Sequence, residues 1–125
     1  MKTECTADFV RFRGKIYPCT VSLAADLAGG KWKAAILYHL QDGEKRFAEL
    51  RRHLVSVTEM TLNRQLKRLE QDGLIEREAF GDKPPLKVVY RLTAFGRTFM
   101  PVLQALTEWG NALALTEGRF EEKAV

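Results

Sequence analysis

The sequence predicts a mainly helical α+β domain, and three observations support this fold class. Apolar residues recur with the 3.6-residue period of a helix in several short segments and in one long C-terminal segment. The period changes to two over residues 74–92, which is typical of strands. N-cap residue types and glycines stand at the ends of the helical segments. With 125 residues, the chain is long enough for one domain with its own core.

The N-terminal part begins with a polar-aromatic arm over residues 1–18. Thr20 is of a residue type that accepts a hydrogen bond from a free helical N–H, so we predict that it caps a helix over residues 21–28. This helix should stop at Gly29 and Gly30, because glycine adopts the backbone conformations that end helices.

Two further helices are predicted before the middle of the chain. The first covers about residues 33–40 and is followed by a turn at Asp42 and Gly43. Residues 45–47 are either a short strand or the entry to the next helix. That next helix covers residues 47–54, whose apolar side chains fall on one side.

A fourth helix begins after Thr58, a good N-cap, and ends at Gly73, which suits a left-handed C-terminal residue. Leu62, Leu66 and Leu69 form its buried stripe, since successive residues are 100° apart. The opposite side of the helix carries long polar or flexible side chains. They are Met60, Asn63, Arg64, Lys67 and Gln71.

The segments that alternate with period two predict a β-hairpin. Its strands lie within residues 74–80 and 87–92, and the turn-forming residues 81–85 include two adjacent prolines that stiffen the tip. Thr93 then caps a long helix, in which Pro101 produces a kink or moves the start of the helix to about Thr98.

Short helices followed by a hairpin, with the third helix bracing the fourth, are the order of elements in a winged helix-turn-helix. In that fold the fourth helix enters the major groove of DNA, so its polar side should meet base edges. Arg64 can donate two hydrogen bonds to guanine, Asn63 can pair with adenine, and Met60 or Thr61 can contact a thymine methyl. Lysines of this helix, of the hairpin and of the turn before the second helix suit phosphates. The predicted DNA-binding set is therefore Thr58, Met60, Thr61, Asn63, Arg64, Lys67, Lys31, Lys83 and Lys87.

Composition is consistent with this interpretation. The formal net charge is +4, and the basic excess lies in residues 1–33 and 43–92, whereas residues 93–125 are slightly acidic. We find no apolar run of membrane-spanning length, no signal-peptide pattern, no catalytic triad, no phosphate-binding loop and no metal-ligand spacing. We therefore expect a cytoplasmic protein that is not an enzyme, with no cofactor, no metal and no membrane partner. A polar helical face can also be merely solvated, and a winged helix can serve protein–protein contact without sequence-specific DNA binding.

Several sequence blocks resemble the HxlR-type winged helix-turn-helix regulators, within the MarR-like group. The resemblance covers residues 19–110 and includes Gly29-Gly30-Lys31-Trp32, Arg46-Phe47-Ala48-Glu49-Leu50, Gly73-Leu74-Ile75 and Tyr90-Arg91-Leu92-Thr93. It implies a homodimeric transcription regulator, commonly a repressor, that binds double-stranded DNA at a palindromic operator. It also allows a small-molecule or oxidant effector.

The resemblance implies that the first helix, the last helix and the arm form the dimer interface. The last helix carries an apolar stripe that a small domain does not bury by itself, and this observation favours the same conclusion. The predicted interface residues are Phe99, Val102, Leu103, Leu106, Trp109 and Leu113. The domain plan is thus an arm (1–18), a DNA-binding domain (19–92), a dimerisation helix in the same compact unit (93–117) and a frayed tail (118–125).

Cys19 aligns with the cysteine that several relatives use to sense oxidants or electrophiles. A thiol just before a helix is stabilised as thiolate by the helix dipole, and Lys15 and Lys31 are candidate cationic neighbours. Cys5 is a candidate resolving thiol. Free cysteine is also commonly a small buried hydrophobe, so a redox role and a structural role for Cys19 both stay open.

Overall fold

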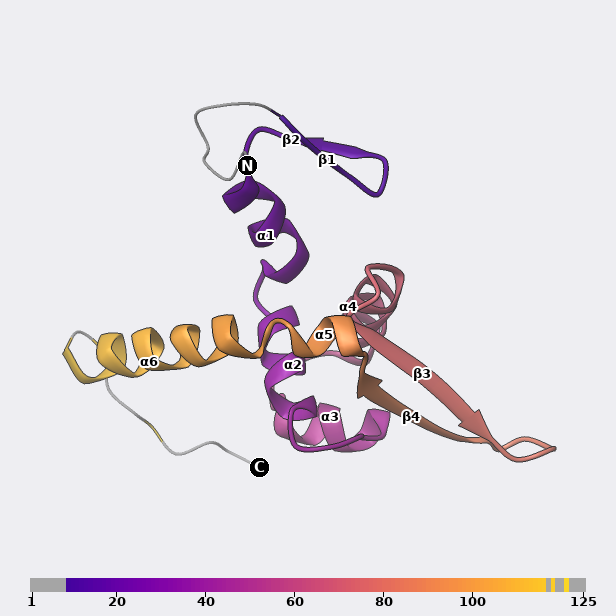
Figure 1. Cartoon of the computed structure of the whole chain (residues 1–125). Helices are drawn as coiled ribbons and strands as arrows, with labels where there is room; N and C mark the ends of the chain where they lie inside the picture. The colour runs from indigo at the N-terminus through magenta and orange to yellow at the C-terminus, as the bar shows by residue number, and fades with distance from the viewer. Residues whose placement is uncertain (1–8, 117, 119–120, 122–125) are drawn as a thin grey trace.

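The computed structural model describes residues 9–116, 118 and 121. Its elements form a helical centre from which three parts project: an N-terminal part, a two-stranded wing and a long C-terminal helix (Figure 1). In chain order they are β1 (Val10–Phe12), β2 (Lys15–Tyr17), α1 (Thr20–Ala28), α2 (Lys33–Leu40), α3 (Phe47–His53), α4 (Glu59–Gln71), β3 (Ile75–Phe80), β4 (Lys87–Leu92), α5 (Ala94–Arg97) and α6 (Met100–Thr116). The wing and α6 point in opposite directions in Figure 1. This is a winged helix-turn-helix fold, as the sequence predicts.

The core lies between α2, α3, α4 and the root of the wing. Its fully buried side chains are Ile36, Leu37, Leu40, Leu50, Leu62, Leu66, Leu69, Ile75 and Val89. The predicted stripe of α4 is buried throughout, with 0 % exposure at Leu62, 1 % at Leu66 and 0 % at Leu69. Burying one face of α4 in this way sets which side chains face solvent on the other.

Both ends of α4 are built as predicted. The Thr58 hydroxyl oxygen accepts a hydrogen bond from the Thr61 backbone N–H at 3.1 Å, which satisfies a free donor of the first turn. After the C-cap residue Asp72, Gly73 has a φ of 80°, in the left-handed region that glycine enters without strain.

The wing is an antiparallel pair in which Ile75 is opposite Leu92 and Phe80 is opposite Lys87. It is fixed to the body on one side by an isolated bridge, where the backbones of Lys45 and Tyr90 exchange hydrogen bonds of 3.0 and 2.8 Å. For residues 45–47 we predicted either a short strand or the entry to the next helix. The structure contains an isolated bridge residue at Lys45, and α3 begins at Phe47.

The N-terminal arm contains a hairpin that we did not predict. Strands β1 and β2 pair around a turn in which Arg13 and Gly14 both have positive φ, at 50° and 79°. Two successive positive φ values are the signature of a type I′ turn, whose twist matches that of the strands it joins. The prediction of Thr20 as N-cap was also wrong, because Cys19 occupies that position and Thr20 is the first helical residue.

The predicted long C-terminal helix is divided in two. Thr93 does cap a helix, since its hydroxyl accepts from the Gly96 N–H at 2.9 Å, but that helix ends at Arg97. α6 begins at Met100, so Pro101 lies in its first turn, where the absence of an N–H costs nothing. The alternative of a later helix start was therefore correct, and the start lies two residues beyond Thr98.

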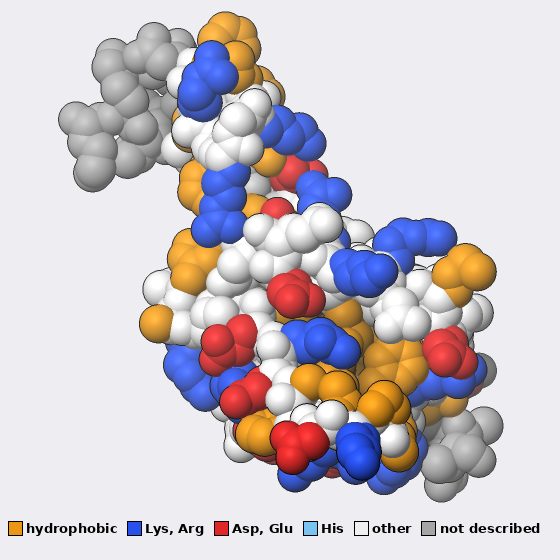
Figure 2. Space-filling model, turned by 90° about the vertical axis from the view of Figure 1, so that its right-hand side faces the viewer, with side chains coloured by type: hydrophobic (Ala, Val, Ile, Leu, Met, Phe, Trp, Pro, Cys, Tyr) orange, Lys and Arg blue, Asp and Glu red, His pale blue; other side chains and the backbone are white. Residues whose placement is uncertain are grey.

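The N-terminal part, made of β1, β2 and α1, is connected to the rest by a narrow region (Figures 1 and 2). No residue of α1 is buried, and Val21 is 69 % exposed. Among the helices that the structure describes, none combines the length and apolar character needed to cross a bilayer.

Candidate nucleic-acid interface

The outward side of α4 presents a continuous polar surface. Glu59, Met60, Asn63, Arg64 and Lys67 line one shallow, solvent-open hollow. Met60 is 70 % exposed, although it is a large apolar side chain. Four of the predicted DNA-contacting side chains thus lie together, on a helix whose opposite face is anchored in the core.

Thr58 and Thr61 have a different position, at the start of α4. Their side-chain oxygens are 2.9 Å apart, and the Thr58 hydroxyl also caps the helix. Both hydroxyls are therefore already engaged in holding the first turn. The exposed N-terminal end of α4 is where helix-turn-helix proteins make many of their base-edge contacts.

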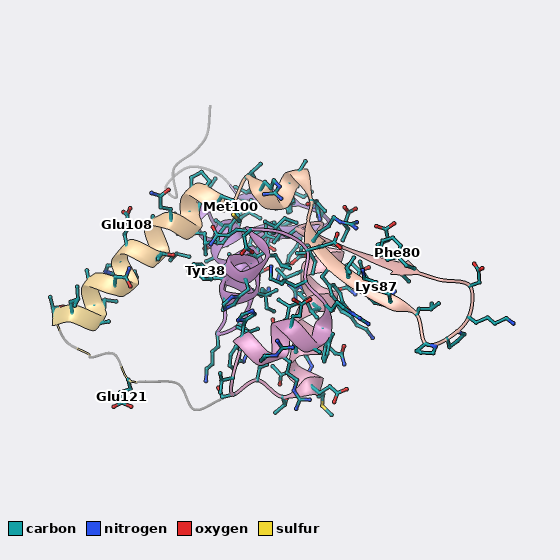
Figure 3. The ribbon with its side chains drawn as sticks, turned by 90° about the horizontal axis from the view of Figure 1, so that it is seen from below. Tyr38, Phe80, Lys87, Met100, Glu108 and Glu121 are labelled. Atoms are coloured by element: carbon teal, nitrogen blue, oxygen red, sulfur yellow. The ribbon has the colours of Figure 1, made fainter. Side chains whose placement is uncertain are left out.

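The wing carries the two other predicted lysines. Lys87 lies on β4 with its ammonium 5.9 Å from the centre of the Phe80 ring on β3, and Figure 3 shows both residues on the projecting wing, away from α6. Lys83 is exposed in the tip, next to the Pro84–Pro85 pair, which is joined by a cis peptide bond.

Lys31 lies in the turn between α1 and α2. Its ammonium is 5.0 Å from the centre of the Trp32 ring. The same turn is close to α4, because Gly29 and Gly30 line a polar hollow together with Arg64 and other side chains of that helix. The turn that bears Lys31 therefore borders the α4 surface.

Basic side chains of α3 and of its N-cap residue were not included in our prediction. Arg46 and Arg52 line a hollow between α3 and the wing residues Leu86 and Val88. The adjacent arginines at positions 51 and 52 could have indicated this, because they fall in the last turn of a helix that precedes the recognition helix. Arg51 differs from its neighbour, since its guanidinium lies 3.5 Å from the Glu59 carboxylate.

The predicted dimer residues fall into two groups. Leu103 is only 4 % exposed and Phe99 packs against the core, so both contact their own domain. The other four are exposed and share one side of α6. Their exposed fractions are 51 % for Val102, 41 % for Leu106, 65 % for Trp109 and 44 % for Leu113.

This exposed side of α6 continues into an apolar groove of about 450 Å³. The groove lies between α1, α5 and α6, and its walls include Val21, Phe95, Val102 and Leu106. Exposed apolar surface of this extent is typical of a surface that meets another protein.

Cys19 is the N-cap of α1 and is disulfide-bonded. Its sulfur lies 3.4 Å from the Ser22 hydroxyl oxygen, within hydrogen-bond distance for sulfur. The two candidate cations make other contacts. The Lys15 ammonium pairs with Asp26 at 3.3 Å, and the Lys31 ammonium lies over the Trp32 ring. Cys5, the other cysteine of the chain, lies outside the described residues.

Comparison with known proteins gives one consistent result. Residues 27–117 match the HxlR-like helix-turn-helix family. The HTH-type transcriptional regulator YybR of Bacillus subtilis (strain 168) is 46 % identical over 101 residues, which are 78 % of this chain and 80 % of that protein. The redox regulator HypR in its reduced form superimposes with a TM-score of 0.71 at 45 % identity, covering 74 % of this chain and 91 % of HypR. A MarR-family regulator from Porphyromonas gingivalis W83 gives a TM-score of 0.70 at 28 % identity, covering 74 % and 90 %.

Proposed function

Because this chain belongs to the HxlR-like helix-turn-helix family of transcriptional regulators, we propose that it acts as a homodimer that recognises a palindromic operator. The observation that carries this proposal is the outward side of α4. It places Met60, Asn63, Arg64 and Lys67 on one open surface of a helix held rigidly from behind. A rigid helix loses little entropy when it docks, so its side chains can discriminate between bases.

The proposed contacts divide into reading and positioning. Arg64 reads guanine and Asn63 reads adenine, because their side chains present the matching pairs of hydrogen-bonding groups. Lys67, Lys31, Lys83 and Lys87 bind phosphates and fix the register of the protein on the duplex. Arg46 and Arg52 extend the phosphate contacts between α3 and the wing.

The apolar side of α6 supports the homodimer. Four large apolar side chains on one side of α6 are more than 40 % exposed. The helix α1, which lines an apolar groove together with α6, has no buried residue. A second copy of the chain, related by a two-fold axis, would cover the apolar side of α6 and the exposed side of α1. The same two surfaces of the second copy would be covered in return. The two α4 helices would then meet half-sites one helical turn apart, about 34 Å, or a multiple of that distance.

Repression is the outcome that this architecture supports most simply. A dimer bound across a promoter excludes polymerase by occupancy alone, whereas activation requires an additional contact with polymerase. An operator can be obtained by letting the purified protein select duplexes from a random pool. Transcription in vitro from a template that carries this selected operator should therefore fall as the protein is added. An increase would assign activation instead.

The test of DNA recognition is duplex binding measured against salt. Each phosphate contact lowers the slope of log affinity against log salt by about 0.9, so several contacts per protomer give a steep negative slope. The alternative function is a winged-helix module that contacts other proteins without sequence-specific DNA binding. It predicts a flat salt dependence and no preference between a selected duplex and a random one.

We further propose that Cys19 makes operator binding responsive to oxidants or electrophiles. Disulfide formation releases two protons and two electrons from two thiols, and diamide or a quinone accepts them. The position of Cys19 as N-cap of α1 and its disulfide-bonded state support this role, as does the relative HypR, which is described as a redox regulator. The second thiol comes from Cys5 or from a second protomer.

Cys19→Ser should bind the operator as the wild type does and lose the response to diamide. Cys5→Ser decides between the two sources of the second thiol, because it removes the response only when the bridge is formed within one chain. A Cys19→Ser protein that still responds fully to diamide and to a quinone would exclude the switch.

A further inference from the structure

The N-terminal part of the molecule is joined to the recognition helix by a polar cluster. We call the cluster the Asp26 junction and define it as Lys15, Tyr17, Asp26, Lys33, Arg68 and Asp72. Figure 2 shows acidic and basic side chains close together in the narrow region where the N-terminal part meets the body. No residue of α1 is fully buried, so directed polar contacts contribute to holding the two parts together.

The Asp26 carboxylate receives donors from two elements. From β2, the Tyr17 hydroxyl donates to Asp26 Oδ2 at 2.6 Å and the Lys15 ammonium donates to the same oxygen at 3.3 Å. From α4, the Arg68 guanidinium lies 3.6 Å from that oxygen. The hydrogen bond from Tyr17 is the largest influence on both partners, and it lowers the pKa of Asp26 and raises the pKa of Tyr17.

Two buried groups make this arrangement specific. The Lys33 side chain of α2 is 7 % exposed, and its ammonium donates to the Asp26 backbone carbonyl at 3.0 Å. Asp72 Oδ2 is shielded from solvent and, among the described residues, has only the ion pair with Arg68 Nε at 3.4 Å. Arg68 is thus held between two carboxylates, one at the end of its own helix and one on α1.

A second contact acts at the same end of α4. Arg13, in the turn of the β1–β2 hairpin, donates from its guanidinium to the Gln71 backbone carbonyl at 3.4 Å. The same guanidinium lies 5.4 Å from the centre of the Phe95 ring. A cation at the carboxyl end of a helix is favoured by the helix dipole. The hairpin therefore contacts α4 at its last turn, while Asp26 contacts it one turn earlier.

We propose that Asp26 is a positioning residue for DNA recognition: through Arg68 it fixes the orientation of α4 relative to the N-terminal part, and it touches no DNA itself. Arg68 is one helical turn beyond Arg64, so a change in its anchor alters the direction of the side chain that reads the base. The proposal rests on the proposed function for its consequence at the operator. The mechanical link between the two parts does not depend on that function.

The link matters because the N-terminal part carries α1 and Cys19. A change in the pose of α1 moves Asp26, and Arg68 must then follow or lose its partner. The junction is thus a polar route from the region of the proposed switch to α4.

The first test needs no DNA. Hydrogen exchange of backbone amides is compared in the wild type, Asp26→Asn, Arg68→Gln and the double variant, with Asp42→Asn as control. Asp42 is a matched control because it is an exposed aspartate whose ion pair with Lys45 spans three residues. We expect the amides of residues 68–72 to exchange roughly fivefold faster in each single variant than in the wild type. In the double variant they should exchange no faster than in either single variant. Unchanged exchange in this segment, or two effects that add, would overturn the link.

The second test uses a duplex selected by the purified protein from a random pool, together with an unselected duplex. Asp26→Asn should bind the selected duplex roughly fivefold more weakly and the unselected duplex within about twofold of the wild type. Equal losses on both duplexes would mean that Asp26 only supports folding, and no loss would mean that α4 needs no such anchor. Either result overturns the positioning role.

Tyr17→Phe provides a milder variant, should Asp26→Asn fail to fold. It removes only the 2.6 Å hydrogen bond to Asp26 and should change the same amides in the same direction. If the wild type itself binds no duplex selectively, the proposed function fails, and the exchange experiment still decides whether the junction couples the two parts.

Discussion

Replacing Arg64 by alanine tests the assignment of α4 as the reading helix. Arg64 lies with Asn63 and Lys67 on the open side of the helix, opposite the buried leucines. Its removal leaves the core untouched, so the free energy of unfolding should change by less than about 0.5 kcal/mol. Any large effect on DNA binding must then come from the lost contact.

The expected magnitude follows from the proposed two-fold arrangement of a homodimer. A bidentate arginine–guanine contact contributes about 1–3 kcal/mol of base discrimination. A dimer contains two such contacts, so the selected duplex should lose about 2–6 kcal/mol of binding free energy. At about 1.4 kcal/mol per factor of ten, this is a loss of roughly 30-fold to 10⁴-fold in affinity.

The assay is fluorescence anisotropy on the selected duplex, on variants of it at each base pair, and on an unselected duplex. Arg64→Ala should lose its preference at one base pair of each half-site and bind the unselected duplex almost as the wild type does. Lys83→Ala is the matched comparison, because it should weaken binding to all duplexes alike and make the salt slope less steep by about 0.9 per protomer. If the two variants act equally on both kinds of duplex, the assignment of Arg64 to a base is refuted.

Three other predictions concern assembly and stability. In the proposed dimer, Trp109→Glu places a charge in the apolar interface of both protomers. It should weaken the free energy of dimerisation by about 2 kcal/mol or more, measured as a shift from dimer to monomer in sedimentation equilibrium. Leu115→Glu, 75 % exposed on the opposite side of α6, should leave the dimer intact, and a dimer that survives Trp109→Glu would exclude this interface. Leu66→Ala should lower the free energy of unfolding in urea by about 2–5 kcal/mol, since a 1 % exposed leucine is lost from the core; a change below 1 kcal/mol would contradict the packing. Asp26 has a pKa below its ordinary value of 3.8, so its contribution to stability is complete above that pH and is lost as the pH falls through the lowered pKa. The difference in free energy of unfolding between wild type and Asp26→Asn should therefore become smaller below pH 3.8. A difference that grows there would contradict the lowered pKa of Asp26.

The elements of the fold that contact the core could be predicted from the sequence. The leucine stripe of α4, the N-cap Thr58 and the left-handed Gly73 are local signals that agree with one another, and α4 has the predicted ends. The same holds for the wing, where two alternating segments flank a turn-forming cluster. Local and global preferences coincide in these segments, so the pattern was sufficient.

The hairpin of the arm was missed because its signal is weak. Its strands have three residues each, too few for a visible alternation, and Arg13-Gly14 is an unusual pair for a turn with two positive φ values. Asparagine or aspartate before the glycine would have indicated the turn.

The Asp26 junction could not be predicted, for a different reason. Asp26 and Arg68 belong to separate helices and are brought together only by the tertiary fold, without any pattern in the sequence that pairs them. Lys33 is a charged residue, and its hydropathy predicts a surface position. It is nevertheless only 7 % exposed, and its ammonium donates a hydrogen bond to a backbone carbonyl. Similarly, Leu103 looked like part of the dimer stripe, but it is buried in its own domain.

The most direct measurement is a hydroxyl-radical footprint of the protein on its selected duplex. Two copies of α4 that face one side of the duplex should protect two symmetrical tracts whose centres are about 34 Å apart, or a multiple of that distance. Trp109→Glu should abolish the paired protection at concentrations at which the wild type is fully bound. A single asymmetric tract, or no protection, would contradict the account of a dimer that reads a palindrome through α4.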